Sequence, residues 1–97
     1  MKVLELLADE SRWHSGAFAI NADGKYVPSN DPSAQKFDLL SAIERCYGNA
    51  TRARFMVQTM MQAYIRDYLG KDYASILYFN QSQPPEIIIK MLEDLQV

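Results

Sequence analysis

The chain has 97 residues, of which 48% are hydrophobic and 23% charged, and its formal net charge is −2 at pH 7. This length fits one domain, and the composition is that of an ordinary folded protein and excludes disorder. Ten basic against twelve acidic residues argue against a nucleic-acid binder, which needs a basic footprint. The single cysteine, Cys46, excludes an internal disulfide and suits a reducing compartment. The short apolar N-terminus matches neither a signal peptide nor a membrane span, so we expect a cytoplasmic protein without a membrane partner.

A short helix followed by a β-hairpin is predicted for the first third of the chain. Apolar side chains in residues 2–10 follow helical spacing. The predicted buried stripe of this helix is Val3, Leu6 and Leu7. Residues 17–20 and 25–27 then flank Asp23 and Gly24, a pair that favours a tight turn between two strands. Because an isolated hairpin is marginal in water, we expect it to pack on helices.

The second helix is predicted to begin at Asp31 and Pro32. An aspartate caps free backbone N–H groups, and proline fits the first helical position because its missing N–H has no partner there. Gly48 is typical of the end of a helix. The predicted buried stripe is Phe37, Leu40, Ile43 and Tyr47.

A third, long helix is predicted from about residue 50 to 69, capped by Asn49 and ended by Gly70. Its predicted apolar stripe is Ala53, Met56, Val57, Met60, Tyr64 and Tyr68, widened by Phe55, Met61, Ile65 and Leu69. A face this broad suits a central helix that is covered on more than one side. The methionines at 56, 60 and 61 are therefore interpreted as core residues, with an adaptable binding groove as the alternative.

Residues 75–79 are predicted to form a short strand, residues 80–83 a loop, and Pro84 and Pro85 the start of a last helix. The inward-facing residues of that helix are expected to be Ile88, Met91, Leu92 and Leu95. The predicted fold is therefore α+β and predominantly helical, with about four helices, a short β-hairpin and one short extra strand in a single domain of residues 1–97.

Three motifs follow one another in the first third of the chain: Trp-His-Ser-Gly-Ala-Phe-Ala at 13–19, Asp-Gly at 23–24 and Asp-Pro-Ser-Ala at 31–34. Their order resembles a family of small uncharacterised bacterial and phage proteins, classed as a domain of unknown function. Residues 76–80 are similar to that family's Ile-x-x-(Trp/Phe)-Asn segment. The chain departs from the family at residues 37–38, where members often have Trp-Cys, and at 80–81, where they have Asn-Asp. The resemblance implies a shared fold and a bacterial or phage origin, and it carries no catalytic residue across.

No catalytic or metal-binding motif is found in the sequence, which lacks a phosphate-binding glycine loop, a nucleophile elbow, paired zinc histidines and an EF-hand loop. His14 is the only histidine, and a hydrogen-bonded structural role is its preferred interpretation. Trp13 and Gly16 are interpreted as a packing anchor between the first helix and the hairpin, with an exposed contact residue as the alternative. An enzyme would have to depend on a pair such as Asp38 and Arg45. We expect no enzymatic activity, cofactor or metal.

Two groups of side chains are candidates for binding. Arginines around the turn at Gly48 suit a phosphate or an acidic partner, although basic residues at helix ends are also routine. Tyrosines around the end of the long helix are typical of protein interfaces, with a half-buried rim as the alternative. The candidate residues are Arg45, Arg52, Arg54, Tyr64, Tyr68, Tyr73 and Tyr78.

These features favour a non-enzymatic protein-interaction module with another protein as its partner. If the gene is phage-borne, the partner is expected to be a bacterial machine such as a CRISPR defence complex. The alternative is a small-ligand binder, with a nucleotide held by Arg45, Arg52 and Tyr47. The apolar faces of the last two helices also fit a homodimer.

Overall fold

The fold is known from a computed structural model, which describes residues 1–70 and 75–97. In chain order the elements are α1 (Val3–Leu7), the 3-10 helix η1 (Glu10–Arg12), β1 (Ala19–Ile20), β2 (Tyr26–Val27), α2 (Leu39–Tyr47), α3 (Arg52–Leu69), α4 (Ile76–Ser82) and α5 (Pro85–Leu95). The two strands pair antiparallel, with Ala19 opposite Val27. Within the described residues, five α-helices and this hairpin confirm the predicted α+β, predominantly helical fold class.

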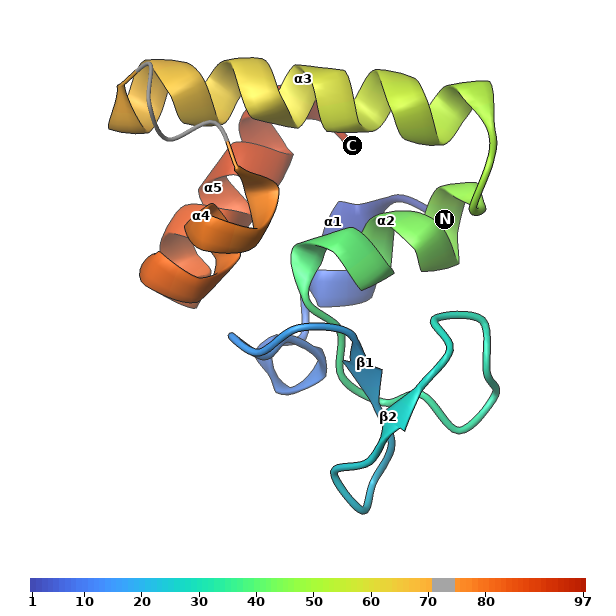
Figure 1. The fold of residues 1–97 in the computed structure, drawn as a ribbon. Coiled ribbons are helices and arrows are strands. Elements are labelled where there is room, and N and C mark those ends of the chain that lie inside the picture. Colours follow the sequence, from blue (N-terminus) through green and yellow to red (C-terminus); the bar gives the residue numbers. More distant parts are fainter. Residues whose placement is uncertain (71–74) are drawn as a thin grey trace.

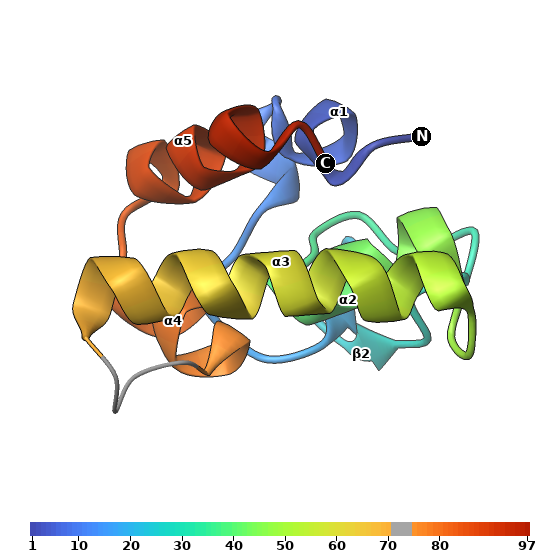
Figure 2. The same ribbon diagram turned by 90° about the horizontal axis from the view of Figure 1, so that it is seen from above.

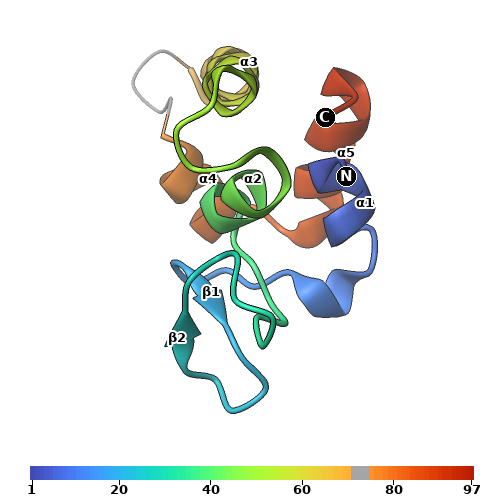
Figure 3. The same cartoon turned by 90° about the vertical axis from the view of Figure 1, so that its right-hand side faces the viewer.

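Helix α2 lies at the centre of the molecule, between α3 on one side and the hairpin on the other (Figure 1, Figure 3). Seen from above, α3 spans the molecule over α2 and α4, and α5 lies beside it with α1 (Figure 2). The two ends of the chain meet, because the Leu4 backbone N–H donates to the Val97 carbonyl oxygen at 2.9 Å. Ala19 of the hairpin is buried in the core, and Ile20 pairs with Lys36 in the segment before α2.

The core is formed by side chains from all five α-helices. The predicted inner stripe of α1 is confirmed, since Val3, Leu6 and Leu7 are buried. Residues Ile88, Met91 and Leu92 of α5 are also buried, as predicted from their helical spacing. Leu95 is only half-buried at the end of α5.

The predicted start of α2 at Asp31 is wrong, because the helix begins at Leu39 and Asp38 is its N-cap. Asp31 instead accepts the Ser33 backbone N–H and stabilises a local turn. The segment between them is extended by pairing with distant backbone: Ile20 N donates to Lys36 O, and Phe37 N donates to Arg12 O. This non-local pairing overrides the local helix signal, so that Phe37 of the predicted helical stripe is buried outside the helix.

Helix α3 matches its predicted range within two residues, but its cap and its buried face differ from the prediction. Thr51 is the N-cap, in place of the predicted Asn49, and it accepts the Arg54 backbone N–H. Gly70, at φ 97°, ends the helix as predicted. The buried residues are Val57, Met61 and Ile65, whereas Phe55, Met56, Met60 and Tyr68 of the predicted broad stripe are exposed. Helix α3 is covered on one side only and is not a central helix.

The predicted strand at 75–79 and loop at 80–83 are wrong, because helix α4 occupies residues 76–82. Ser75 caps this helix by accepting the Tyr78 backbone N–H. The buried residues of α4 are Ile76, Phe79 and Asn80. Their spacing of three and four residues places them on one face of the helix. The sequence pattern hid this face because one inward residue is polar.

Asn80 joins three parts of the fold from its buried position in α4. Its Oδ1 accepts hydrogen bonds from Trp13 Nε1 at 2.8 Å and from the Leu39 backbone N–H at 3.1 Å. Its Nδ2 donates to the His14 carbonyl oxygen at 3.1 Å. Trp13 is therefore anchored to α4 through its polar partner, and its predicted role as an anchor between the first helix and the hairpin stays a prediction.

Candidate functional site

A pocket of about 360 Å³ lies where the segment before β1 meets α2, α3 and α4. This volume falls at the lower end of the range of small-molecule sites, roughly 300–1,000 Å³. Its lining consists of the apolar residues Ala17, Phe18, Leu40 and Leu77 and the polar residues Asp38, Ser41, Glu44 and Arg54. We name it the α2 pocket, because half of these residues belong to α2 or cap it.

Asp38 is the buried polar residue of the α2 pocket, with only 2% of its surface exposed. Its Oδ1 accepts hydrogen bonds from the Ser41 backbone N–H at 3.0 Å and from the Ser41 hydroxyl. Among the residues that the structure describes, no hydrogen bond or ion pair is made to its Oδ2. Oδ2 is not one of the fully buried atoms without a partner, so this oxygen keeps some accessible surface on a residue that lines the pocket.

Phe18 forms the rim of the α2 pocket in a strained backbone conformation. Its φ is 66°, in the left-handed region that bulky side chains rarely adopt, and its side chain is 66% exposed. The Gly16 backbone N–H donates to His14 Nδ1 at 3.2 Å, so Nε2 carries the ring proton and donates to the Phe18 carbonyl oxygen at 2.7 Å. The Phe18 ring meets the Tyr26 ring edge to face at 5.8 Å. His14 therefore has the structural role expected from the sequence, and this role is to hold the rim.

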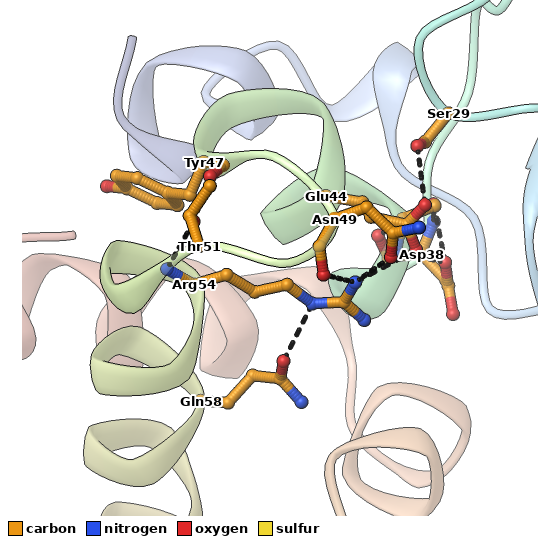
Figure 4. A network of polar contacts seen from close by, with 9 residues as sticks. Ser29, Asp38, Glu44, Tyr47, Asn49, Thr51, Arg54 and Gln58 are labelled. Atoms are coloured by element: carbon orange, nitrogen blue, oxygen red, sulfur yellow. Dashed lines mark hydrogen bonds and ion pairs between the residues drawn. The ribbon is translucent and has the colours of Figure 1, made fainter.

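Arg54 crosses from the first turn of α3 to the edge of the α2 pocket (Figure 4). Its Nε donates to Gln58 Oε1 at 2.8 Å, and its Nη1 donates to the Asn49 carbonyl oxygen at 2.7 Å. Nη1 also lies 3.6 Å from Glu44 Oε2, while Ser29 Oγ donates to Glu44 Oε1 at 3.1 Å. Both oxygens of Glu44 are therefore engaged within the chain.

The structure brings two of the three candidate arginines into one network. Arg45 Nη1 donates to the carbonyl oxygens of Ser29 and Asp31, each at 3.0 Å, and its guanidinium lies 5.7 Å from the centre of the Phe37 ring. Ser29 and Glu44 link Arg45 to Arg54. Arg52 is exposed at the start of α3. Because Arg45 holds a loop, its geometry offers little support for the nucleotide alternative.

Two of the four candidate tyrosines lie together on α3. Tyr64 and Tyr68 line a shallow pocket with Asp67. The Tyr64 hydroxyl donates to Asp94 Oδ2 at 2.8 Å, and the Tyr68 ring contacts Phe79 edge to face at 5.7 Å. Tyr78 is 47% exposed on α4, and Tyr73 lies outside the described residues. A binding role of these residues stays a prediction.

The Tyr64 contact predicts a stability change at alkaline pH. Burial and then the hydrogen bond to Asp94 raise the pKa of Tyr64 to about 12 from its usual value of 10.0. The unfolded chain therefore loses this proton first, so the stabilisation is complete below about pH 10 and is lost as the pH rises to about 12. Urea denaturation at several pH values should show a smaller fall in unfolding free energy for Tyr64→Phe than for the wild type. Equal falls in the two proteins would contradict this assignment.

The outer face of α3 carries three exposed apolar side chains within two turns. Phe55 is 71% exposed, Met56 55% and Met60 40%. Met56 and Met60 are four residues apart and therefore neighbours on the helix surface. Together these three residues are named the α3 outer face. The preferred interpretation of Met56 and Met60 as core residues is wrong, and only Met61 of the three methionines is buried.

Sequence reasoning missed the α2 pocket because its lining comes from four separate segments. It placed Phe18 and Leu77 in strands and considered Asp38 only beside Arg45. One local signal was available, since Asp38 and Ser41 have the spacing of an N-cap and its N3 partner. That signal indicates the helix start and says nothing of the apolar walls.

The comparisons with known proteins give no relative. No family model matches the chain, no curated protein is significantly similar to it, and no solved structure shares its fold at a significant level. The resemblance to small bacterial and phage proteins stays a prediction. In residues 1–70 and 75–97, no helix combines the length and hydropathy needed to cross a bilayer. The same residues contain no group of three or more His, Cys, Asp or Glu side chains able to hold a metal ion.

Proposed function

We propose that this protein is a non-enzymatic interaction module that docks on another protein through the α3 outer face. The observation that carries the proposal is the exposure of Phe55, Met56 and Met60 on consecutive turns of one helix. Exposed apolar side chains that gather in one place are typical of interaction sites, whereas single ones are ordinary. Methionine and aromatic side chains are also enriched at interfaces.

The form of the α3 outer face favours a partner with an apolar groove. A helix that presents side chains at successive turns binds by laying them into such a groove. Helix α3 is 18 residues long and lies at one edge of the molecule, with its inner side on α2 and α4 (Figure 1). In the form suggested by the sequence resemblance, the module is phage-borne and its partner is a bacterial machine such as a CRISPR complex.

Affinity capture from bacterial lysate tests the proposal with two matched variants. We expect the wild type to retain one stoichiometric partner and Met56→Glu to lose it by at least about tenfold, because a charge would have to be desolvated in the groove. Gln62→Glu adds the same charge at another exposed position of α3 and should retain the partner. Both variants should keep the wild-type unfolding free energy within about 0.5 kcal/mol.

Partner binding that survives Met56→Glu would contradict docking through the α3 outer face. A second copy of the chain is the other possible occupant, and light scattering distinguishes it. If the wild type has a dimeric mass and Met56→Glu a monomeric one, the α3 outer face binds a second copy of the chain and not another protein.

A further inference from the structure

We infer that the α2 pocket binds a short alkyl chain that carries a primary ammonium group. The chain would lie along the apolar walls and the ammonium would donate to Asp38 Oδ2. This inference is independent of the proposed docking through the α3 outer face, because none of Phe55, Met56 and Met60 lines the pocket.

The charges around the α2 pocket favour a cation. Two carboxylates, Asp38 and Glu44, face one guanidinium, Arg54, so the charged lining groups sum to one negative charge. Glu44 is already neutralised by Arg54 and hydrogen-bonded by Ser29. The unbalanced charge is therefore that of Asp38, and an anionic ligand such as a phosphate would be repelled.

The hydrogen-bonding state of Asp38 indicates where the cation would lie. A carboxylate oxygen that keeps accessible surface and has no donor from the chain is open to a donor from a ligand, and a charged donor makes the stronger hydrogen bond. Asp38 as a whole is 2% exposed, and its Oδ2, which is not one of the fully buried atoms without a partner, lacks a donor among the described residues. An ammonium group supplies up to three donors and a compensating charge, whereas a hydroxyl supplies one donor and no charge.

The apolar walls account for the alkyl part of the ligand. The apolar lining residues Ala17, Phe18, Leu40 and Leu77 come from three separate segments of the chain. Phe18 is held at the rim by the His14 hydrogen bond to its carbonyl oxygen, despite its strained backbone. A strained residue maintained by its surroundings is typical of ligand-binding positions.

Titration of the ¹⁵N-labelled protein with n-butylammonium, followed by amide chemical shifts, tests the inference. The neutral molecule 1-pentanol is the matched control of similar length. We expect shifts at Phe18, Leu40 and Leu77, and an affinity for n-butylammonium at least about tenfold higher than for 1-pentanol, because a charge-assisted hydrogen bond is about twice as strong as a neutral one. Equal affinities, or the absence of shifts at these residues, would overturn it.

Two variants identify the groups responsible. Asp38→Asn should remove the preference for the cation while preserving the fold, because asparagine caps helices as well as aspartate. Leu77→Ala should weaken both probes by a similar factor, because it removes a wall and leaves the charge in place. A cation preference that persists in Asp38→Asn would disprove the role of the Asp38 carboxylate.

The same ammonium chemistry occurs in free amines and in lysine side chains. A titration with Nα-acetyl-lysine N-methylamide distinguishes these sources. Shifts comparable to those of n-butylammonium would extend the site to a lysine of a bound polypeptide, and shifts with n-butylammonium alone would restrict it to free amines.

Discussion

Replacing Asn80 with alanine is expected to lower the unfolding free energy by about 3–4 kcal/mol. The substitution removes the acceptor of Trp13 Nε1 and of the Leu39 backbone N–H, and the donor to the His14 carbonyl oxygen. Each buried polar group left without a partner costs about 1–3 kcal/mol. Since a domain of this kind has a total stability of about 5–15 kcal/mol, Asn80→Ala should lose a large share of its stability. Urea denaturation followed by circular dichroism measures the difference.

Gln81→Ala is the matched control for Asn80→Ala. Gln81 is the next residue of α4, is exposed, and should tolerate alanine within about 0.5 kcal/mol. A loss below about 1 kcal/mol in Asn80→Ala would mean that Asn80 does not join α4 to α2 and Trp13 in the way its hydrogen bonds indicate.

The second large effect is expected for Phe37→Ala, at about 3–5 kcal/mol, the usual cost of removing a buried aromatic side chain. Phe37 is fully buried, and the guanidinium groups of Arg12 and Arg45 each lie 5.7 Å from its ring centre. The substitution therefore leaves a cavity and also removes two cation–π contacts. Thermal or urea denaturation of the purified variant measures the combined loss.

Two further variants separate the contributions to the Phe37 effect. Phe37→Leu keeps most of the volume, so its cost, expected to be below about 1.5 kcal/mol, reports mainly the lost cation–π contacts. Phe55→Ala removes an equal side chain from the exposed α3 outer face and should change stability by less than about 0.5 kcal/mol. A large loss in Phe55→Ala would show that Phe55 stabilises the fold and would weaken the proposed docking surface.

Asn80 and Phe37 also connect the fold to the α2 pocket. Phe37 precedes Asp38, and the Asn80 side chain accepts the backbone N–H of Leu39 on the other side of that residue. Asp38 is thus held between two buried contacts, which fixes the start of α2 and the pocket floor together. Destabilising either contact is expected to disturb the pocket as well as the fold.

The sequence alone determined the elements whose signals are local and repeated. Helix α5 follows from the proline pair at 84–85 and from apolar residues spaced by three and four. The range of α3 follows in the same way from its length and from Gly70. Turn chemistry located the hairpin, because the Asp23–Gly24 pair needs no distant partner to favour a turn.

Tertiary structure decided the start of α2, the identity of α4 and the α2 pocket. Residues 35–37 are extended because they pair with the backbone of Ile20 and Arg12, a contact that no local pattern encodes. Helix α4 depends on Asn80, whose burial is tolerable only because Trp13, His14 and Leu39 supply its hydrogen bonds. Sequence reasoning identified Arg54 as a candidate but did not bring it together with the other residues of the α2 pocket. Apolar periodicity shows which side chains can be buried, whereas only packing decides which of them remain exposed around a site.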